Sequence, residues 1–301
     1  MNTNNKLFGV IIAYLIVIII WSTTPLAIKW SAVGVDFITG VSARMLIGTL
    51  LALTLCLLWQ KKLPMDKNAL TVYAISSTAI YGSMMLVYFG AQYISSGLVS
   101  VIFGLAPIFT SWFAIHFFGL EKFNLGKFLG AILGIAGLAF IFREQINLGQ
   151  NAYLGIVTVL IAVMMHAISA VGIKQVNKEI PALQVTTGGL AFSLPLFLVS
   201  FYTFANPIPD EIPVRTLAAI IYLGIMGSVV GFVSYYYVLA NLTASTVALA
   251  TLITPVTALL LGNIFNHESI SNATWNGTGL ILLGLIVHQF KGMKSRQLIK
   301  K

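Results

Sequence analysis

His166 is the one titratable side chain that we place well inside a long apolar stretch of this sequence. An imidazole in apolar surroundings usually faces a cavity or a polar partner. It could hydrogen-bond a bound solute, or take up a proton near neutral pH. The alternative is a neutral histidine bonded to a nearby hydroxyl such as Ser169. The residues alone leave both roles open.

Aromatic and hydroxyl side chains form a second group of candidates. Tyr81, Met85 and Tyr88 follow one another at spacings of four and three residues, which places them on one helix face. Such a face could line a cavity, with rings packed on a solute and hydroxyls bonded to it. For a single tyrosine, helix packing or a place at the membrane interface is the more ordinary role. The candidate cavity residues are Trp21, Thr24, Tyr81, Met85, Tyr88, His166, Ser169 and Tyr235.

Acidic side chains avoid the middle of every apolar stretch. Asp36, Asp66 and the remaining aspartates and glutamates all fall at ends or in loops. This distribution argues against proton or sodium coupling through carboxylates. It also argues against a strong preference for cations, which would depend on aromatic faces alone. Passive facilitation, or weak proton coupling through His166, remains open.

Basic residues inside apolar stretches have structural interpretations. Arg44 lies about two helical turns into its stretch. It could extend its side chain outward to the membrane surface, or pair with Asp36. A role in admitting anions is the less favoured alternative, and Lys29 is interpreted in the same way.

Motifs of catalysis or metal binding are missing from the sequence. We find no His-Glu-x-x-His, Gly-x-Ser-x-Gly or phosphate-loop pattern. Cys56 is the only cysteine, which leaves no disulfide framework and no thiolate metal site. We therefore expect no enzyme activity, no metal and no cofactor.

The composition indicates that these candidate residues belong to a protein embedded in a lipid bilayer. Charged residues make up 8% and hydrophobic residues 58% of the 301 residues, whereas soluble domains carry roughly 25% charged residues. The net charge of +9 comes from lysines and arginines in short loops and at the C-terminus. These suit lipid headgroups rather than nucleic acid.

Ten apolar stretches have the length of a membrane span, which needs about 20 residues. The first has no cleavage site after it and is read as a span rather than a signal peptide. The spans are predicted at Leu7–Ile28, Phe37–Trp59, Ala69–Ala91, Leu98–Phe118, Leu125–Phe142, Ala152–Ile173, Leu183–Ala205, Leu217–Leu239, Ser245–Phe265 and Trp275–Phe290.

The two halves of the chain repeat each other about 147 residues apart. The stretch 88–97 (YFGAQYISSG) matches 236–245 (YYVLANLTAS), and Ala106-Pro107 matches Thr254-Pro255. Each half holds five spans, so the second half must enter the bilayer upside down. Two inverted halves around a central site are a common plan of secondary carriers.

Basic residues give the orientation. With the N-terminus in the cytoplasm, 13 of the 17 lysines and arginines lie inside and four outside, which satisfies the positive-inside rule. Both termini are then cytoplasmic. The four outside are Lys29, Arg44, Arg143 and Arg215.

Proline and glycine mark two kinds of helix. Pro107 and Pro255 interrupt the fourth and ninth spans at matching places, and we expect a bend at each. Small residues allow close helix packing in lipid. The fifth and tenth spans are therefore predicted to be scaffold, through Gly130, Gly134, Gly137, Gly277 and Gly284.

These residues together resemble the drug/metabolite transporter superfamily, EamA type. The stretch 21–29 (WSTTPLAIK) is similar to the first-helix signature, and Ser42-Ala43-Arg44 to the arginine of the second helix. Ser95-Ser96-Gly97, Ala106-Pro107 and Glu121-Lys122 resemble later elements, which the second half repeats through Ala244-Ser245, Pro255 and Glu268.

The sequence departs from the family pattern in three places. Leu120 and His267 stand where a glycine is expected before each glutamate, and the repeat counterpart of Arg44 is Gly189. The resemblance implies ten helices and a central cavity formed by helices one, three, four, six, eight and nine. It also implies transport of amino acids, other metabolites or toxic organic compounds.

We therefore expect an all-α polytopic membrane protein of ten transmembrane helices in a 5+5 inverted-topology repeat. Residues 1–147 form the first repeat, and residues 148–301 the second with its basic tail. The expected function is a secondary transporter of the cell (inner) membrane that exports a small neutral or zwitterionic metabolite by alternating access. Its partners would be the solute, membrane lipids and, through His166, a coupled proton. The rivals are a membrane-embedded enzyme or sensor without a soluble domain, and a rigid channel.

Overall fold

The structure is a computed structural model that describes residues 3–120, 122–148, 151–177, 179–243, 246–247 and 249–297. Every regular element in these ranges is a helix. Four residues used above in the repeat or the charge pattern lie outside the described residues: Glu121, Lys178, Ala244 and Ser245.

The first half forms five successive helical segments, some of them interrupted, which we call passes. They consist of α1 (Thr3–Trp30); α2 (Phe37–Leu58); α3 (Lys67–Ser77), η1 (Thr78–Ser83) and α4 (Met84–Gly90); α5 (Ser96–Phe103) and α6 (Ala106–His116); and α7 (Leu125–Leu148). Asp36 and Asp66 begin α2 and α3 by accepting hydrogen bonds from the first amides of each helix.

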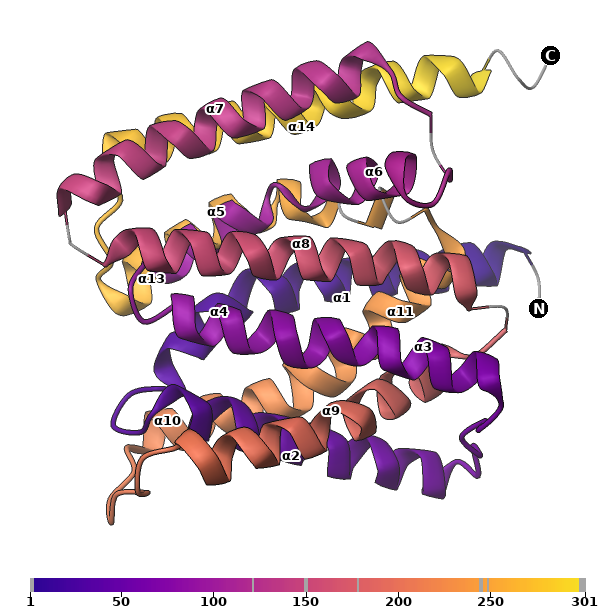
Figure 1. Ribbon diagram of the computed structural model, residues 1–301, viewed down its shortest axis with the longest axis vertical. Helices are drawn as coiled ribbons and strands as arrows, with labels where there is room; N and C mark the ends of the chain where they lie inside the picture. Colours follow the sequence, from indigo (N-terminus) through magenta and orange to yellow (C-terminus); the bar gives the residue numbers. More distant parts are fainter. Residues whose placement is uncertain are drawn as a thin grey trace.

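The second half repeats this order. Its elements are α8 (Ala152–Val176); α9 (Ala182–Phe204); α10 (Val214–Tyr222), η2 (Leu223–Val230) and α11 (Gly231–Asn241); η3 (Leu249–Leu252) and α13 (Thr254–Asn266); and α14 (Asn272–Gln297). In Figure 1, α1 begins and α14 ends at the same end of the bundle, whereas α1 and α8 end at opposite ends.

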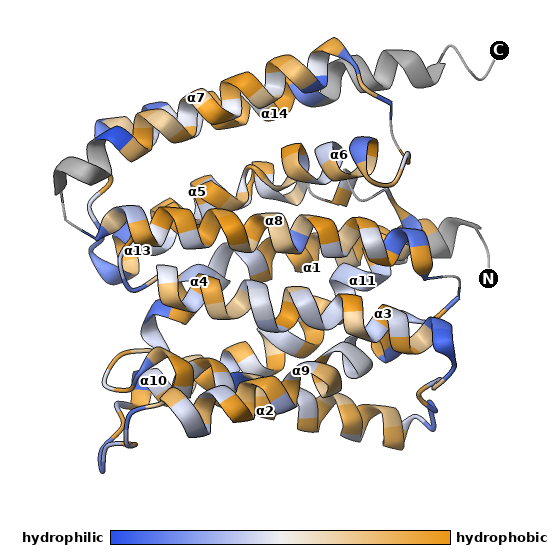
Figure 2. Cartoon of the chain, in the orientation of Figure 1, coloured by the Kyte–Doolittle hydropathy of each residue, from blue (hydrophilic) through white to orange (hydrophobic). Residues whose placement is uncertain are grey.

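Length and composition allow eight helices of the described chain to cross a membrane. They are Leu7–Trp30, Phe37–Leu58, Lys67–Gly90, Ser96–His116, Leu125–Arg143, Ala152–Val176, Ala182–Phe204 and Val214–Asn241. Apolar residues cover these helices, and polar residues collect towards their ends (Figure 2). Outward-facing Ile19, Ile135 and Val199 are each more than 60% exposed, as expected of side chains that face lipid. The protein is therefore a multi-pass membrane protein.

The predicted count of ten spans exceeds these eight. The predicted ninth span is broken, because α13 begins only at Thr254. The tenth falls short because α14 opens with the polar residues Asn272, Thr274 and Asn276. The number ten therefore remains a prediction.

The two prolines of the repeat stand at helix starts rather than inside continuous helices. Pro107 lies in the first turn of α6, just after Gly104 and Leu105 interrupt the fourth pass. Pro255 lies in the first turn of α13. Proline is favoured there because its missing amide hydrogen would have no helical partner anyway. Each break thus falls a few residues before the proline.

A second interruption is also duplicated, and no sequence pattern predicted it. The third and eighth passes each contain a π-helical stretch, η1 and η2, at equivalent places. A π turn holds an extra residue, so it shifts the face on which all later side chains lie, and such turns are common at functional sites.

The glycines of α7 and α14 form a reciprocal contact (Figure 1). A Cβ added at Gly130 would lie 2.5 Å from the carbonyl oxygen of Gly284, and one at Gly284 would lie 2.7 Å from that of Gly130. Gly137 and Gly277 face each other in the same way, at 2.6 and 2.7 Å. Only glycine lets the two backbones approach so closely.

Packing elsewhere also comes in matched pairs. In the first half α4 and α6 pack on α8, and in the second half α11 and α13 pack on α1. Likewise α3 and η1 pack on α9 in one set of contacts, and α10 and η2 pack on α2 in the other. Exchanging the two halves converts each contact into the equivalent contact of the other half. The equivalent helices α1 and α8 lie on either side of the centre.

Candidate functional site

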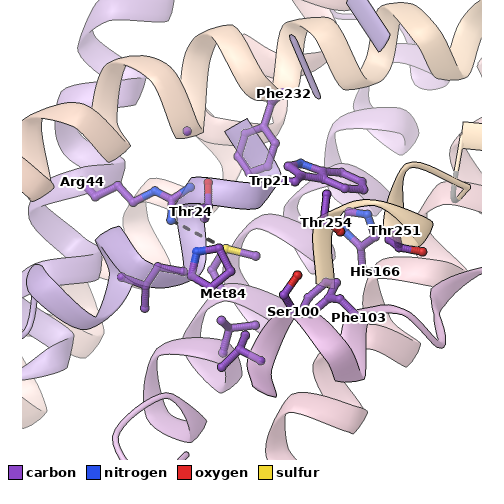
Figure 3. A pocket seen from close by; sticks show the side chains of 15 residues that line it. Trp21, Thr24, Arg44, Met84, Ser100, Phe103, His166, Phe232, Thr251 and Thr254 are labelled. Carbon is purple, nitrogen blue, oxygen red and sulfur yellow. Dashed lines mark hydrogen bonds between the residues drawn. The ribbon is translucent and has the colours of Figure 1, made fainter. Parts of the chain in front are cut away.

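A cavity of about 70 Å³ lies between the two halves and draws its walls from both (Figure 3). A cavity needs roughly 10–15 Å³ to admit one water, so this one is large enough to hold water. It is lined by Trp21, Thr24, Pro25, Ile28, Arg44, Met84, Val87, Val99, Ser100, Phe103, His166, Gly227, Phe232, Thr251 and Thr254.

Two larger hollows lie elsewhere on the protein, with volumes of about 330 and 390 Å³. Exposed residues such as Trp112 line the first and Phe265 the second, so both face the lipid side of the bundle. The small central cavity is the better candidate because the buried guanidinium of Arg44 and the ring of His166 line it.

Aromatic rings gather at one end of this cavity. The ring of His166 lies 5.7 Å from that of Trp21, 6.1 Å from Phe103 and 5.2 Å from Tyr235, between ring centroids. Ser169 does not serve as a partner of His166, because its hydroxyl donates to the Ile75 carbonyl at 2.8 Å. Edge and tilted ring contacts of this kind can hold an apolar or aromatic group of a solute.

Arg44 lies at the other end (Figure 3). Its side chain is only 1% exposed. The Nε atom donates to the Ser228 hydroxyl at 3.0 Å, and an Nη atom lies 4.0 Å from the Met84 sulfur. The proposals of an outward side chain or a pair with Asp36 are therefore wrong. Asp36 instead accepts hydrogen bonds from the amides of Ile38 and Asn206.

Hydroxyls and a proline complete the lining. The Thr24 hydroxyl donates to the Ile20 carbonyl at 2.7 Å, so towards a solute it offers an oxygen acceptor. Pro25 has no amide hydrogen, so the carbonyl of Trp21, four residues earlier, has no partner in the helix ladder. Helix α1 thus adds backbone polarity to the cavity wall.

Half of the predicted cavity residues lie at this site. Trp21, Thr24 and His166 line the cavity, and Tyr235 lines a small neighbouring space that shares Trp21, Phe103 and His166. The two helix-bend prolines lie outside the lining.

The other four predicted residues serve helix packing. Tyr81 bonds Ser200 at 2.8 Å, Tyr88 accepts from Ser31 at 3.4 Å, and Ser169 bonds Ile75. Met85 packs against the apolar core. The third pass instead turns the face that carries Met84 and Val87, three residues apart, towards the cavity.

Several lining residues were missed from the sequence. Arg44 is the important one, and its signal was a guanidinium in the middle of an apolar stretch. The others come from both halves and carry no pattern that would have singled them out: Pro25, Met84, Ser100, Phe103, Gly227, Phe232, Thr251 and Thr254.

Metal ligands do not cluster in the described part of the chain, where no three His, Cys, Asp or Glu side chains lie close enough to hold an ion. Cys56 is buried and lies 3.3 Å from the Thr187 hydroxyl, in the packing between helices.

Glu268 ties three helices together at one end of the bundle. One carboxylate oxygen accepts from the Ser96 hydroxyl at 2.8 Å and the Gly97 amide at 3.4 Å, at the start of α5. The other accepts from Asn266 at 2.9 Å, and Asn266 in turn accepts from the Trp30 ring at 3.0 Å. A carboxylate at a helix start also suits the helix dipole.

At the opposite end, a cavity of about 330 Å³ lies where α8 and α11 end, and Lys174, Tyr236 and Tyr237 are among its lining residues. Lys174 donates to the carbonyls of Leu239 and Ala240 at 2.8 and 3.1 Å, which satisfies the last turn of α11.

Comparison with known proteins agrees with this architecture. The EamA-like transporter family matches the chain twice, over residues 7–143 and 153–288. The Uncharacterized transporter YoaV of Bacillus subtilis is 29% identical over 93% of this chain and 97% of that protein. The Uncharacterized inner membrane transporter YedA of Escherichia coli K12 is 25% identical over 93% of this chain and 90% of that protein.

A solved structure titled "Crystal structure of protein" shares the fold, with a TM-score of 0.68 and 17% identity over 93% of this chain and 96% of that one. The two family matches together cover most of the sequence, and the relatives are named as transporters. With its duplicated helical halves and a cavity between them, the chain belongs to the EamA-like transporter family.

Proposed function

We propose that this protein is a secondary transporter that carries a small neutral or zwitterionic organic metabolite across the cell (inner) membrane by alternating access. The central cavity supports this proposal most directly, because it is enclosed by both halves and holds aromatic, hydroxyl and cationic groups. In this proposal the cavity residues bind the solute, and the halves rock around it.

The proposal includes ten helices in a 5+5 inverted repeat, with boundaries at residues 1–147 and 148–301. The matched helix contacts, the two π stretches and the two helix breaks before Pro107 and Pro255 support it. The breaks would let the fourth and ninth passes bend as access changes.

In the state described, the Glu268 end is the closed one. Three helices meet at this carboxylate, and we take the end with the cavity near Lys174 as the open side. Since the charge pattern places the Lys174 end and both termini in the cytoplasm, the protein would face inward here. Loading from the cytoplasm fits export, which is the direction that we propose.

Transport by reconstituted protein tests the function. Purified protein in liposomes loaded with amino acids and nucleosides should release at least one of them with saturable kinetics. Flux that stays linear with concentration would point to a channel, and no flux of any solute would contradict the proposal.

His166 offers a matched pair of variants. His166→Ala should lower solute flux at least tenfold while the protein stays folded, because the ring contacts with Trp21 and Tyr235 disappear. His116→Ala, at an exposed position outside the central cavity, should transport normally. Wild-type flux in His166→Ala would show that His166 is not part of the binding site. If collapsing a pH gradient does not change the flux, transport is not coupled to a proton.

Glu268 tests alternating access. Glu268→Gln keeps the side-chain shape but weakens the bonds to Ser96 and Gly97. We expect the closed end to open more often, seen as faster labelling of a cysteine introduced at Ser100 from that side. Unchanged labelling would contradict a gating role.

A further inference from the structure

We infer that Arg44 selects solutes that carry a carboxylate, so that the transported metabolite is a small carboxylic acid such as an amino acid. The inference rests on the proposed function and narrows its solute class. It comes from the position and neighbours of one buried guanidinium.

Arg44 is a cation kept away from water at a high cost. A buried charge is tolerated in a membrane protein when a partner or a function compensates for it. Three carboxylates have partners elsewhere: Asp36 at the start of α2, Asp66 at the start of α3, and Glu268 on Ser96 and Asn266. The described neighbours of the guanidinium are instead neutral, Ser228 and Met84.

The geometry leaves part of the guanidinium for a ligand. An arginine has five N–H donors, and its planar fork fits the two oxygens of a carboxylate. The Ser228 hydroxyl takes the Nε donor, and the Met84 sulfur at 4.0 Å is a weak acceptor for one Nη. The described residues that line the same cavity include no aspartate or glutamate. A solute carboxylate would supply the missing negative charge.

The rest of the cavity fits the remainder of such a solute. Trp21, Phe103 and His166 lie at the end away from Arg44 (Figure 3), where an apolar side chain can pack on their rings. The volume of about 70 Å³ admits only a small molecule. An amino acid would place its carboxylate on Arg44 and its side chain among the rings.

Gly227 leaves room for the guanidinium. A Cβ added at Gly227 would lie 2.9 Å from an Nη atom of Arg44. The atom it meets is the mobile end of a long side chain, so Gly227→Ala should displace the guanidinium without unfolding the protein. This substitution moves the charged guanidinium while it keeps Arg44 itself.

The test measures release of a defined mixture from proteoliposomes by mass spectrometry. The mixture contains the proteinogenic amino acids, their carboxamides and the common nucleosides. Wild-type protein should release one or more amino acids and spare the matching carboxamides. Arg44→Gln should lower that release at least tenfold, and Arg44→Lys, which keeps the charge but loses the fork, should raise KM more than it lowers kcat. Gly227→Ala should also raise KM severalfold.

Two controls separate folding from binding. Arg143→Gln removes an exposed arginine on α7 and should leave release unchanged. Each variant should elute as wild type in size-exclusion chromatography, and the Gly227→Ala result stands even if Arg44→Gln fails to fold.

The outcomes separate this inference from the proposed function. Release of carboxamides or nucleosides as fast as amino acids, or wild-type release by Arg44→Gln, would overturn the inference and leave the transporter intact. Release of nothing by the wild-type protein would overturn both.

Discussion

The two π-helical stretches carry the same Gly-Ser pair in very different surroundings. In η2, Gly227 and Ser228 lie against Arg44, and the Ser228 hydroxyl accepts its Nε hydrogen. In η1, the equivalent Ser83 hydroxyl is buried and has no hydrogen-bond partner. The helix that would supply the partner has Gly189 at the position equivalent to Arg44.

This difference shows which features the two halves share and which they do not. The backbone is repeated down to the π stretches, the helix breaks and the reciprocal glycines of α7 and α14. The charge is not repeated, because Arg44 is the one lysine or arginine among the described residues that line the cavity. In the proposed transport cycle, the symmetric frame would move as two equal halves, while the asymmetric lining would bind the solute in one orientation.

The largest effect should come from Gly189. A Cβ there would overlap Ser76 and lie 3.0 Å from Ile80. Gly189→Ala should therefore separate α9 from α3, break the 2.6 Å bond between Ser76 and Tyr236, and lower the free energy of unfolding by about 3 kcal/mol. Chemical unfolding in detergent measures this.

Gly279→Ala is its control, because a Cβ at Gly279 meets no atom within 4 Å. It should unfold like the wild type. Equal stability of the Gly189 and Gly279 variants would show that α9 does not need a glycine at the position equivalent to Arg44.

A smaller effect is expected at Ser228. Ser228→Ala removes the acceptor of a buried charged hydrogen bond, so it should lower the free energy of unfolding by about 1.5 kcal/mol. A bound carboxylate should restore part of this loss, which thermal unfolding with and without a transported amino acid would detect. No loss of stability would mean that Arg44 finds another partner.

The smallest effect should come from Ser83. Ser83→Ala removes a buried hydroxyl that lacks a partner, so stability should stay within about 0.5 kcal/mol of wild type or rise. The same unfolding assay compares it directly with Ser228→Ala. A loss as large as that of Ser228→Ala would make the two halves equivalent and would contradict the comparison.

The sequence predicted much of the frame, because apolar length, proline and glycine act locally. The family, the helical class, the reciprocal glycine packing and the breaks near Pro107 and Pro255 all follow from such patterns. The cavity lining was harder to predict. Regular helix spacing placed Tyr81, Met85 and Tyr88 on one face, but that spacing cannot tell which face of the helix meets the cavity, and Met84 and Val87 line it instead.

Arg44 shows the second limit. Its spacing in the sequence indicates only that it lies inside an apolar span. Whether it extends to water, pairs with Asp36 or faces a cavity depends on η2, more than 180 residues away in sequence. Such a long-range neighbour leaves no local pattern, so the structure was needed to identify the charge in the site.

The most direct test of the account is the sidedness of two related lysines. In a chain with Cys56 replaced by serine, Lys29→Cys and Lys174→Cys would be labelled separately with a membrane-impermeant maleimide on intact cells and on inside-out vesicles. Opposite threading of the two halves predicts that residue 29 reacts only on cells and residue 174 only on vesicles. Reaction of both from the same side would contradict the inverted repeat and the carrier built on it.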